Sequence, residues 1–101
     1  MEKIKNCYEL TNEADYDINE IFDYTEENHG LDQAVKYVSE FIPVFKHLLI
    51  NPTIGNKRIE INEKLFSISK DEHVIFYEIL ENSILIIRVL HGSRDLPKHF
   101  K

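Results

Sequence analysis

Apolar residues in the second half of the chain fall in short runs separated by polar breaks. Two of these runs, residues 73–80 and 84–90, are rich in β-branched and aromatic side chains, which pack well on a pleated sheet. The polar break at 81–83 between them has the length of a hairpin turn. A shorter run, residues 65–69, precedes them across the polar segment 70–72. The pattern predicts a three-stranded antiparallel meander.

The first half of the chain carries apolar residues at helical spacing. One stripe covers residues 14–25 and follows Thr11, which together with the next residue is typical of a helix N-cap. A second stripe covers residues 34–49, and we expect Asp32 to cap that helix. Gly30 between the stripes predicts a left-handed C-cap. Because the loop between the helices is short, they are predicted to form an antiparallel hairpin.

Proline is the main irregularity in the second helical stripe. Pro43 leaves one carbonyl without a donor, which costs about 3 kcal/mol in a helix interior. Because the stripe continues in phase on both sides, we predict a kink near residues 39–43 and not a break. Looser patterns predict a short first strand over residues 4–10 and a short extended piece over residues 57–61.

The predicted order of elements is β-α-α-β-β-β. It implies one α+β domain over residues 1–101, with a helical hairpin packed on one face of a small antiparallel sheet. Both faces of the central strand are apolar, with Val74, Phe76 and Leu80 on one and Ile75, Tyr77 and Ile79 on the other. One face must meet the helices, and the other is either covered or left for a partner.

The distribution of charge is uneven. The formal net charge is −6; residues 1–50 carry eleven acidic and four basic side chains, and residues 51–101 carry seven and eight. This balance argues against a general or sequence-specific nucleic-acid binder, whose affinity depends on neutralising phosphates. It favours a basic protein partner or a small local basic site. On the first predicted helix, we expect a solvated acidic face made by Glu13, Asp15, Asp17, Glu20, Asp23, Glu26 and Glu27.

Cysteine and histidine positions offer little for metal or redox chemistry. Cys7 is the single cysteine, so the chain has neither an internal disulfide nor a CxxC motif. The five histidines show no HxH or HxxxH spacing, so we expect no metal and no cofactor. No apolar run is long enough for a signal peptide or a membrane span. Together these features predict a cytoplasmic protein.

A set of short motifs runs along nearly all 101 residues in a familiar order and spacing. They are Tyr8-Glu9-Leu10-Thr11 with Ala14, Asp17-Ile18, Ile21 and Tyr24; Gly30 with Gln33-Ala34; Asn51-Pro52 with Gly55; His73-Val74-Ile75-Phe76-Tyr77; and Ile86 to Asp95. With these motifs the chain resembles the RelE/ParE superfamily of toxins from bacterial type II toxin–antitoxin systems, and the ParE branch most closely.

The resemblance implies a growth-inhibiting toxin that is neutralised by a cognate antitoxin, which is ParD-like and carries a ribbon-helix-helix DNA-binding domain. In the ParE branch the implied target is DNA gyrase, poisoned so that cleaved DNA accumulates, with a role in plasmid maintenance. In the RelE branch the implied activity is ribosome-dependent, metal-free cleavage of mRNA. A third possibility is a non-toxic member that only binds its antitoxin.

The chain departs from the family pattern in its charge and at Phe66, and two missing groups weaken the nuclease alternative. These toxins are usually basic, whereas this chain is acidic. Phe66 stands where the family usually has a basic residue, and the chain ends in His99-Phe100-Lys101, which supplies no phenolic hydroxyl. A nuclease needs groups that stabilise the transition-state phosphate and move protons. If the chain is a nuclease, its candidate catalytic residues are Arg88, His91, Arg94 and His99.

Positive charge near the end of the chain predicts the surface that contacts the target. The candidate target-binding residues are Arg88, His91, Arg94 and Lys98. For Arg88 the alternative is a structural ion pair with Glu60 or Glu78, because an arginine inside an apolar strand needs a partner. Four apolar residues outside the buried stripes predict a groove for an extended antitoxin segment: Tyr16, Tyr24, Tyr37 and Val44.

Overall fold

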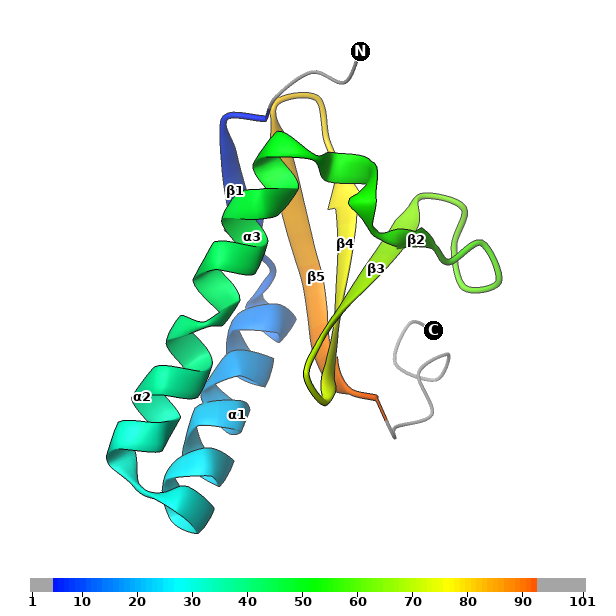
Figure 1. The fold of residues 1–101 in the computed structure, drawn as a ribbon. Coiled ribbons are helices and arrows are strands. Elements are labelled where there is room, and N and C mark those ends of the chain that lie inside the picture. Colours follow the sequence, from blue (N-terminus) through cyan, green and yellow to red (C-terminus); the bar gives the residue numbers. More distant parts are fainter. Residues whose placement is uncertain (1–4, 93–101) are drawn as a thin grey trace.

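The computed structural model describes residues 5–92, which form a five-stranded sheet with helices on one side (Figure 1). The elements in chain order are β1 Cys7–Leu10, α1 Asn12–His29, α2 Leu31–Ser39, α3 Phe41–Ile50, the 3₁₀ helix η1 Pro52–Ile54, β2 Asn56–Lys57, β3 Leu65–Lys70, β4 His73–Ile79 and β5 Ser83–His91. The predicted α+β class and the order of elements are confirmed.

The sheet has the strand order β1-β5-β4-β3-β2. Strands β3, β4 and β5 form the predicted antiparallel meander. The expectation of a purely antiparallel sheet is wrong, because β1 pairs with β5 in parallel. A parallel pair needs a long connection, and the helices together with the meander provide one between β1 and β5. Strand β5 therefore lies inside the sheet and not at its edge.

The predicted extended piece at residues 57–61 is shorter in the structure. Only Asn56 and Lys57 pair with β3. The chain then turns away, and the Ile61 N–H donates to the Arg58 carbonyl at 2.9 Å. The apolar residues Ile59 and Ile61 therefore lie in a turn and not in a strand, and Ile59 is exposed to solvent.

Local capping residues set the limits of the first two helices. Thr11 is the N-cap of α1, and its Oγ1 accepts the Ala14 N–H at 3.0 Å, as the sequence predicts. Gly30 ends α1 with a φ of +91°, in the region of positive φ that favours glycine. Its carbonyl also accepts the Ala34 N–H at 3.1 Å, so Gly30 begins α2 as well. The predicted cap Asp32 is instead inside the first turn of α2.

Helices α2 and α3 form one long bent helix (Figure 1). The bend lies at Glu40, whose φ of −71° and ψ of −14° remain helical. Pro43 lies in the first turn of α3, where its missing N–H leaves the Ser39 carbonyl without its usual donor. The predicted kink near residues 39–43 is confirmed.

Apolar side chains pack on both faces of the sheet, as the pattern of β4 predicts. The main core lies between the helices and the sheet and includes Ala14, Ile21, Phe41, Phe45, Leu48, Phe66, Ile75, Tyr77, Ile84, Ile86 and Val89. A smaller cluster on the other face contains Leu65, Phe76 and Leu90. Leu80, predicted to share a face with Phe76, is 37% exposed beyond the end of β4.

Tyr77 ties the segment after α3 to the sheet. Its hydroxyl donates to the Pro52 carbonyl at 2.7 Å and accepts the Gly55 N–H at 3.0 Å. A Cβ on Gly55 would lie 2.5 Å from the Tyr77 hydroxyl and 2.6 Å from the Ser67 carbonyl oxygen. The Asn-Pro-x-x-Gly motif therefore allows the backbone to pass closely over β3 and β4.

Candidate functional site

An ion pair between Asp17 of α1 and Arg88 of β5 borders the site. The Arg88 Nε and Nη2 donate to the two Asp17 carboxylate oxygens at 2.8 and 3.0 Å, and the Val89 N–H donates to Oδ2 at 3.0 Å. The hydrogen bond to Asp17 raises the pKa of Arg88. Asp17 was expected on the solvated acidic face, but it is only 4% exposed. The predicted partners of Arg88, Glu60 and Glu78, are therefore wrong.

The same region of α1 completes the edge of β5 beyond the end of β1. Pairing between β1 and β5 stops at Leu10 and Ile86. From there the Thr11 hydroxyl donates to the Ile87 carbonyl at 2.7 Å, and Asp17 accepts the next outward N–H, that of Val89. The side chains of the N-cap Thr11 and of Asp17 thus take the place of a neighbouring strand. Asp17 occupies a position of the buried stripe, three residues after Ala14, and this spacing is the signal that the sequence interpretation missed.

A groove of about 860 Å³ opens beside this ion pair, between the α1–α2 hairpin and the ends of β4 and β5; we name it the hairpin–sheet groove. Its lining comes from Asp17, Glu20, Ile21, Tyr24, Thr25 and His29 of α1, Gln33 and Tyr37 of α2, and Glu72, His73, Val89, Leu90 and His91. Among these lining residues of the described chain there are three carboxylates and three histidines, but no lysine or arginine. Since Arg88 neutralises Asp17, the remaining carboxylates of Glu20 and Glu72 favour neutral or cationic groups over a phosphate.

Of the two predicted target-binding residues that the structure describes, Arg88 and His91, only His91 lines this groove. Its Nε2 lies 3.7 Å from the Glu72 carboxylate, and its side chain is 43% exposed. Arg88 is directed to Asp17 instead, with 19% of its side chain exposed. Although they are only three residues apart in the chain, the two side chains have different roles. Arg88 holds α1 on β5, whereas His91 faces the groove. Arg94, Lys98 and His99 lie outside the described residues.

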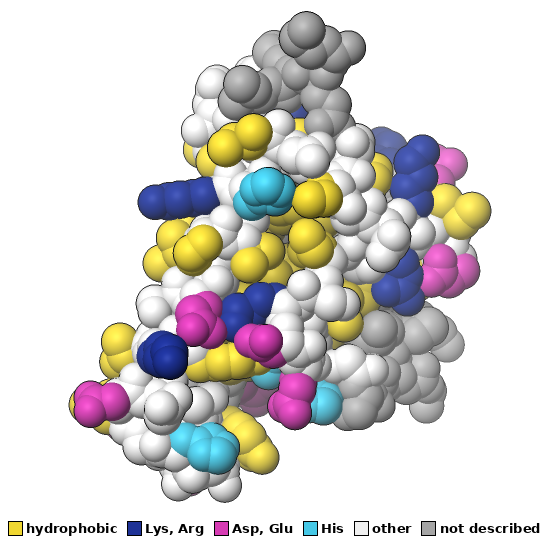
Figure 2. All heavy atoms as spheres, in the orientation of Figure 1, with side chains coloured by type: hydrophobic (Ala, Val, Ile, Leu, Met, Phe, Trp, Pro, Cys, Tyr) yellow, Lys and Arg dark blue, Asp and Glu magenta, His cyan; other side chains and the backbone are white. Residues whose placement is uncertain are grey.

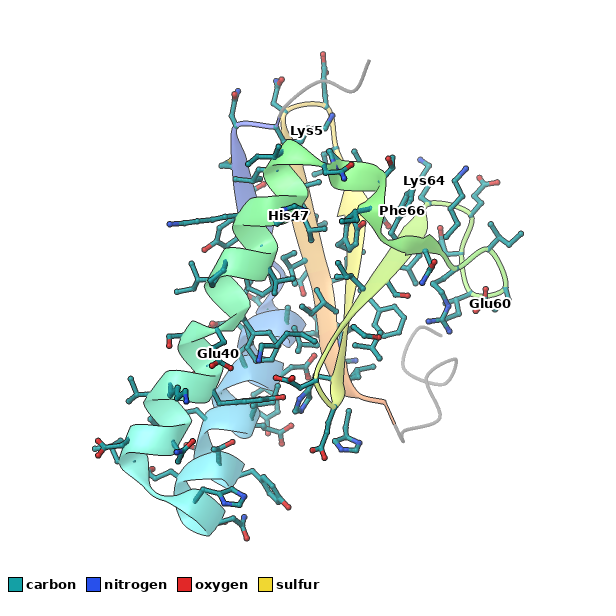
Figure 3. All side chains as sticks on the ribbon, viewed as in Figure 1. Lys5, Glu40, His47, Glu60, Lys64 and Phe66 are labelled. Atoms are coloured by element: carbon teal, nitrogen blue, oxygen red, sulfur yellow. The ribbon has the colours of Figure 1, made fainter. Side chains whose placement is uncertain are left out.

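The position of Phe66 changes one argument about nuclease chemistry. Phe66, labelled in Figure 3, stacks on Tyr77 with ring centroids 5.5 Å apart and belongs to the core under the helices. A basic side chain at this position would point into the same core. The absence of a basic residue at Phe66 therefore says little about catalysis, contrary to the sequence interpretation.

A second groove, of about 390 Å³, lies between the helices and β1; we name it the apolar groove. It is lined by Tyr8, Leu10, Asp15, Ile18, Phe22, Val35, Val38, Ser39, Phe41, Ile42 and Phe45. Leu31, Val35 and Ile42, four and seven residues apart along the bent helix, are 55%, 54% and 44% exposed. Hydrophobic side chains are visible at the surface beside α3, whereas charged ones of both signs gather over α2 (Figure 2). The sequence interpretation recognised the stripe over residues 34–49 and did not single out Leu31 and Val35, although their spacing from Ile42 was present in the sequence.

The four predicted antitoxin-binding residues do not share one surface. Tyr24 and Tyr37 line the hairpin–sheet groove, and Tyr24 is 66% exposed. Tyr16 is 63% exposed on α1, and Val44 is partly buried against the main core. Neither Tyr16 nor Val44 lines either groove.

Comparison with known proteins assigns the chain to a family. A family model described as "ParE toxin of type II toxin-antitoxin system, parDE" matches residues 8–96. The chain belongs to the ParE toxin family. The chain is 32% identical over 93 residues to Toxin ParE1 of Mycobacterium tuberculosis (strain CDC 1551 / Oshkosh), a match that covers 91% of this chain and 95% of the relative. Toxin ParE1 of Caulobacter vibrioides is 28% identical over 92 residues with the same coverage.

A solved structure supports the same fold for this ParE-family toxin. A chain of the "Chromosomal ParDE TA system from P. aeruginosa" superposes with a TM-score of 0.75, covering 87% of this chain and 96% of that chain at 18% identity. The predicted resemblance to the ParE branch is therefore confirmed, and the chain is a toxin of a type II toxin–antitoxin system, which implies an antitoxin as partner.

Two further findings concern the described residues alone. Within residues 5–92, no three histidine, cysteine, aspartate or glutamate side chains gather so that they could hold a metal ion. None of the helices in this part of the chain combines the length and apolar character needed to cross a bilayer.

Proposed function

We propose that this ParE-family toxin inhibits growth by binding and poisoning DNA gyrase in the cytoplasm. A ParD-like antitoxin with a ribbon-helix-helix DNA-binding domain neutralises it. The observation that carries the proposal is the family match over residues 8–96. In this view the toxin acts by contact with its target, and it needs neither a cofactor nor a metal.

The charge of the hairpin–sheet groove favours this proposal over RNA cleavage. A nuclease must stabilise added negative charge on a phosphate in the transition state. The groove has no lysine or arginine among its described lining residues, and of its carboxylates Asp17 is paired with Arg88 while Glu20 and Glu72 add negative charge. Such a lining gives a phosphodiester little electrostatic stabilisation. The gyrase contact is assigned to His91 with Arg94 and Lys98, and Arg88 supports it by holding β5 against α1.

The apolar groove is the proposed docking site of the antitoxin. Val35 and Ile42 expose about half of their side chains on its rim, where an apolar face of a partner would cover them. Exposed carboxylates on α1, including Asp15 at the groove, favour basic residues beside that apolar face. Tyr24 and Tyr37, at the other groove, would contact a further part of the same antitoxin.

The target is tested with purified toxin in two parallel assays. One contains DNA gyrase and supercoiled plasmid, and the other contains ribosomes programmed with mRNA. We expect cleaved plasmid DNA that depends on both toxin and gyrase, with intact mRNA. Cleaved mRNA without any effect on gyrase would overturn the proposal in favour of a RelE-like activity. No effect in either assay or on growth would indicate a member that only binds its antitoxin.

The docking site is tested with matched exposed residues. Val35→Asp adds a charge to the apolar groove, and Ile59→Asp adds the same charge in the turn after β2, where Ile59 is 70% exposed. We expect Val35→Asp to weaken binding of the antitoxin encoded by the neighbouring gene by about 10-fold or more, and Ile59→Asp to leave it unchanged. Equal affinities for the two variants in titration calorimetry would place the antitoxin elsewhere.

A further inference from the structure

The hairpin–sheet groove combines an accessible aromatic ring with negative charge. Tyr24 lines it from α1 and is 66% exposed. Glu20, one turn earlier on α1, and Glu72, from the turn between β3 and β4, line it as well, and both are exposed. Because Arg88 neutralises Asp17, these two glutamates supply the remaining negative charge of the groove. An aromatic ring beside carboxylates attracts the side chain of a lysine or arginine.

The protein already uses this chemistry at the neighbouring tyrosine of α2. Lys70 Nζ lies 4.4 Å from the centroid of the Tyr37 ring, and the same ammonium group pairs with the carboxylates of Glu40 and Asp71. Tyr37 is therefore engaged by a cation of the chain itself. Tyr24, which is more exposed, is the ring of the groove that is open to a cation from outside.

The two grooves lie on opposite sides of the α1–α2 hairpin. Gln33 and Tyr37 line the hairpin–sheet groove, whereas Val35, two residues from each of them, lines the apolar groove. Residues two apart in an α-helix point in nearly opposite directions. A single extended segment therefore reaches both grooves by passing around the hairpin.

An exposed apolar stripe marks a route around the tip of the hairpin. Ile42, Val35 and Leu31 are 44%, 54% and 55% exposed and follow one another along the bent helix towards the turn at Gly30. His29, on the other side of this turn, lines the hairpin–sheet groove. The tip extends past the end of the sheet and stands clear of the strands (Figure 1). The helix from Ile42 to Leu31 is about 16 Å long, a distance that about five residues of extended chain cover.

We propose that the hairpin–sheet groove is a recognition site for one lysine or arginine of the antitoxin, carried on a segment that continues from the apolar groove around the hairpin tip. This inference rests on the proposed docking of the antitoxin at the apolar groove. The cation lies over the Tyr24 ring, between Glu20 and Glu72. It also covers His91 in the same groove, so this contact blocks part of the surface assigned to gyrase.

Titration calorimetry with the antitoxin encoded by the neighbouring gene tests the two carboxylates. We expect the double variant Glu20→Gln/Glu72→Gln to bind about 5-fold more weakly at low salt and to differ less at about 0.5 M salt, because exposed ion pairs are weak and screened. The control is Glu63→Gln/Glu81→Gln, which changes the net charge equally at two exposed residues that line neither groove. It should alter the affinity by less than about 2-fold.

The aromatic contact is tested with two matched tyrosines of α1. Tyr24→Leu removes the ring from the groove, and Tyr16→Leu removes a ring that is 63% exposed and lines neither groove. We expect Tyr24→Leu to weaken antitoxin binding by about 3-fold and Tyr16→Leu to leave it unchanged. Tyr24→Phe keeps the ring and should retain most of the affinity. Unchanged melting temperatures show that the variants are folded.

A double-mutant cycle identifies the cation. Each lysine and arginine of the antitoxin is changed to alanine in turn, and one of these changes should be coupled to Glu20→Gln/Glu72→Gln. Absence of coupling to every basic residue would overturn the inference. If Val35→Asp weakens binding and the groove variants do not, the antitoxin docks at the apolar groove and only this inference is wrong. If neither weakens binding, the proposed docking site is wrong as well.

Discussion

Asp17 and Arg88, 71 residues apart in the chain, form a two-pronged ion pair that fastens α1 to β5. Asp17 accepts a third hydrogen bond from the Val89 N–H, on the side of β5 where β1 has already ended at Leu10. One carboxylate therefore binds both a half-buried guanidinium and a backbone N–H at the strand edge. Such a group is costly to remove, because its partners stay behind without an acceptor.

Removing the carboxylate should destabilise the fold. We expect Asp17→Ala to lower the free energy of unfolding by about 3 kcal/mol, because the substitution leaves the Arg88 guanidinium and the Val89 N–H without their acceptor. Asp15→Ala removes an exposed carboxylate from the same helix and should change it by less than about 0.5 kcal/mol. Urea denaturation measures both variants, and similar midpoints would mean that the ion pair contributes little.

The smaller cluster on the far face of the sheet depends on one aromatic ring. Phe76 is fully buried there, and Arg58 lies over its ring at 5.4 Å. We expect Phe76→Ala to cost about 3–5 kcal/mol through the cavity it leaves. Phe66→Ala should cost less, because Phe66 is 9% exposed and lies near the start of its strand. If urea denaturation showed that Phe66→Ala is the more destabilised of the two variants, this assignment of the two faces would be wrong.

Gly55 should not tolerate a side chain. A Cβ at this position would meet the Ser67 carbonyl oxygen at 2.6 Å, and a backbone atom in a sheet cannot easily move aside. We expect Gly55→Ala to destabilise the protein by about 1–3 kcal/mol. The control is Gly92→Ala, where the nearest atom to the new Cβ lies 3.5 Å away. Thermal unfolding compares the two, and equal melting temperatures would argue against close packing at Gly55.

Stability should fall when the solution is acidified. The pKa of His73 is lowered by burial and by His91, so below the ordinary value of about 6.5 the unfolded chain binds more protons than the folded one. The contribution of His73 is therefore fully present above about pH 6.5 and is lost as the pH falls through its folded pKa. Urea midpoints measured across this range should decline less in His73→Gln. An unchanged slope in that variant would assign the effect to other groups.

Toxicity should depend on the basic end of the chain. We expect Arg94→Ala, outside the described residues, to reduce growth inhibition while leaving antitoxin affinity intact, because the proposed antitoxin groove lies among the helices. His91→Ala should have a smaller effect, since binding without RNA cleavage needs no proton transfer. Induced expression and pull-down with the antitoxin test both variants. Complete loss of activity in His91→Ala alone would favour the nuclease.

Several elements follow from local sequence. The meander is predicted because β-branched runs alternate with polar turns, and each limit of its strands in the structure lies within one residue of the predicted limit. Thr11 as a cap, Gly30 as a helix end and the kink before Pro43 depend on groups a few residues apart in the chain. The family motifs lie on these same elements, so the fold class could be predicted with them.

Other features depend on contacts between segments that are far apart in the sequence. Periodicity places Asp17 on the stripe of Ala14 and Ile21, but a carboxylate is buried only if a cation and a free N–H reach it, and both come from β5. Likewise, spacing cannot tell that Val35 and Ile42 stay exposed, since the core beneath them is already filled by Ala34, Phe41 and Phe45. The sequence by itself determined the helices, the strands and the family, because these depend on neighbours along the chain. The tertiary structure decided which polar groups are buried and which apolar ones remain open to a partner, because burial depends on contacts between residues far apart in sequence.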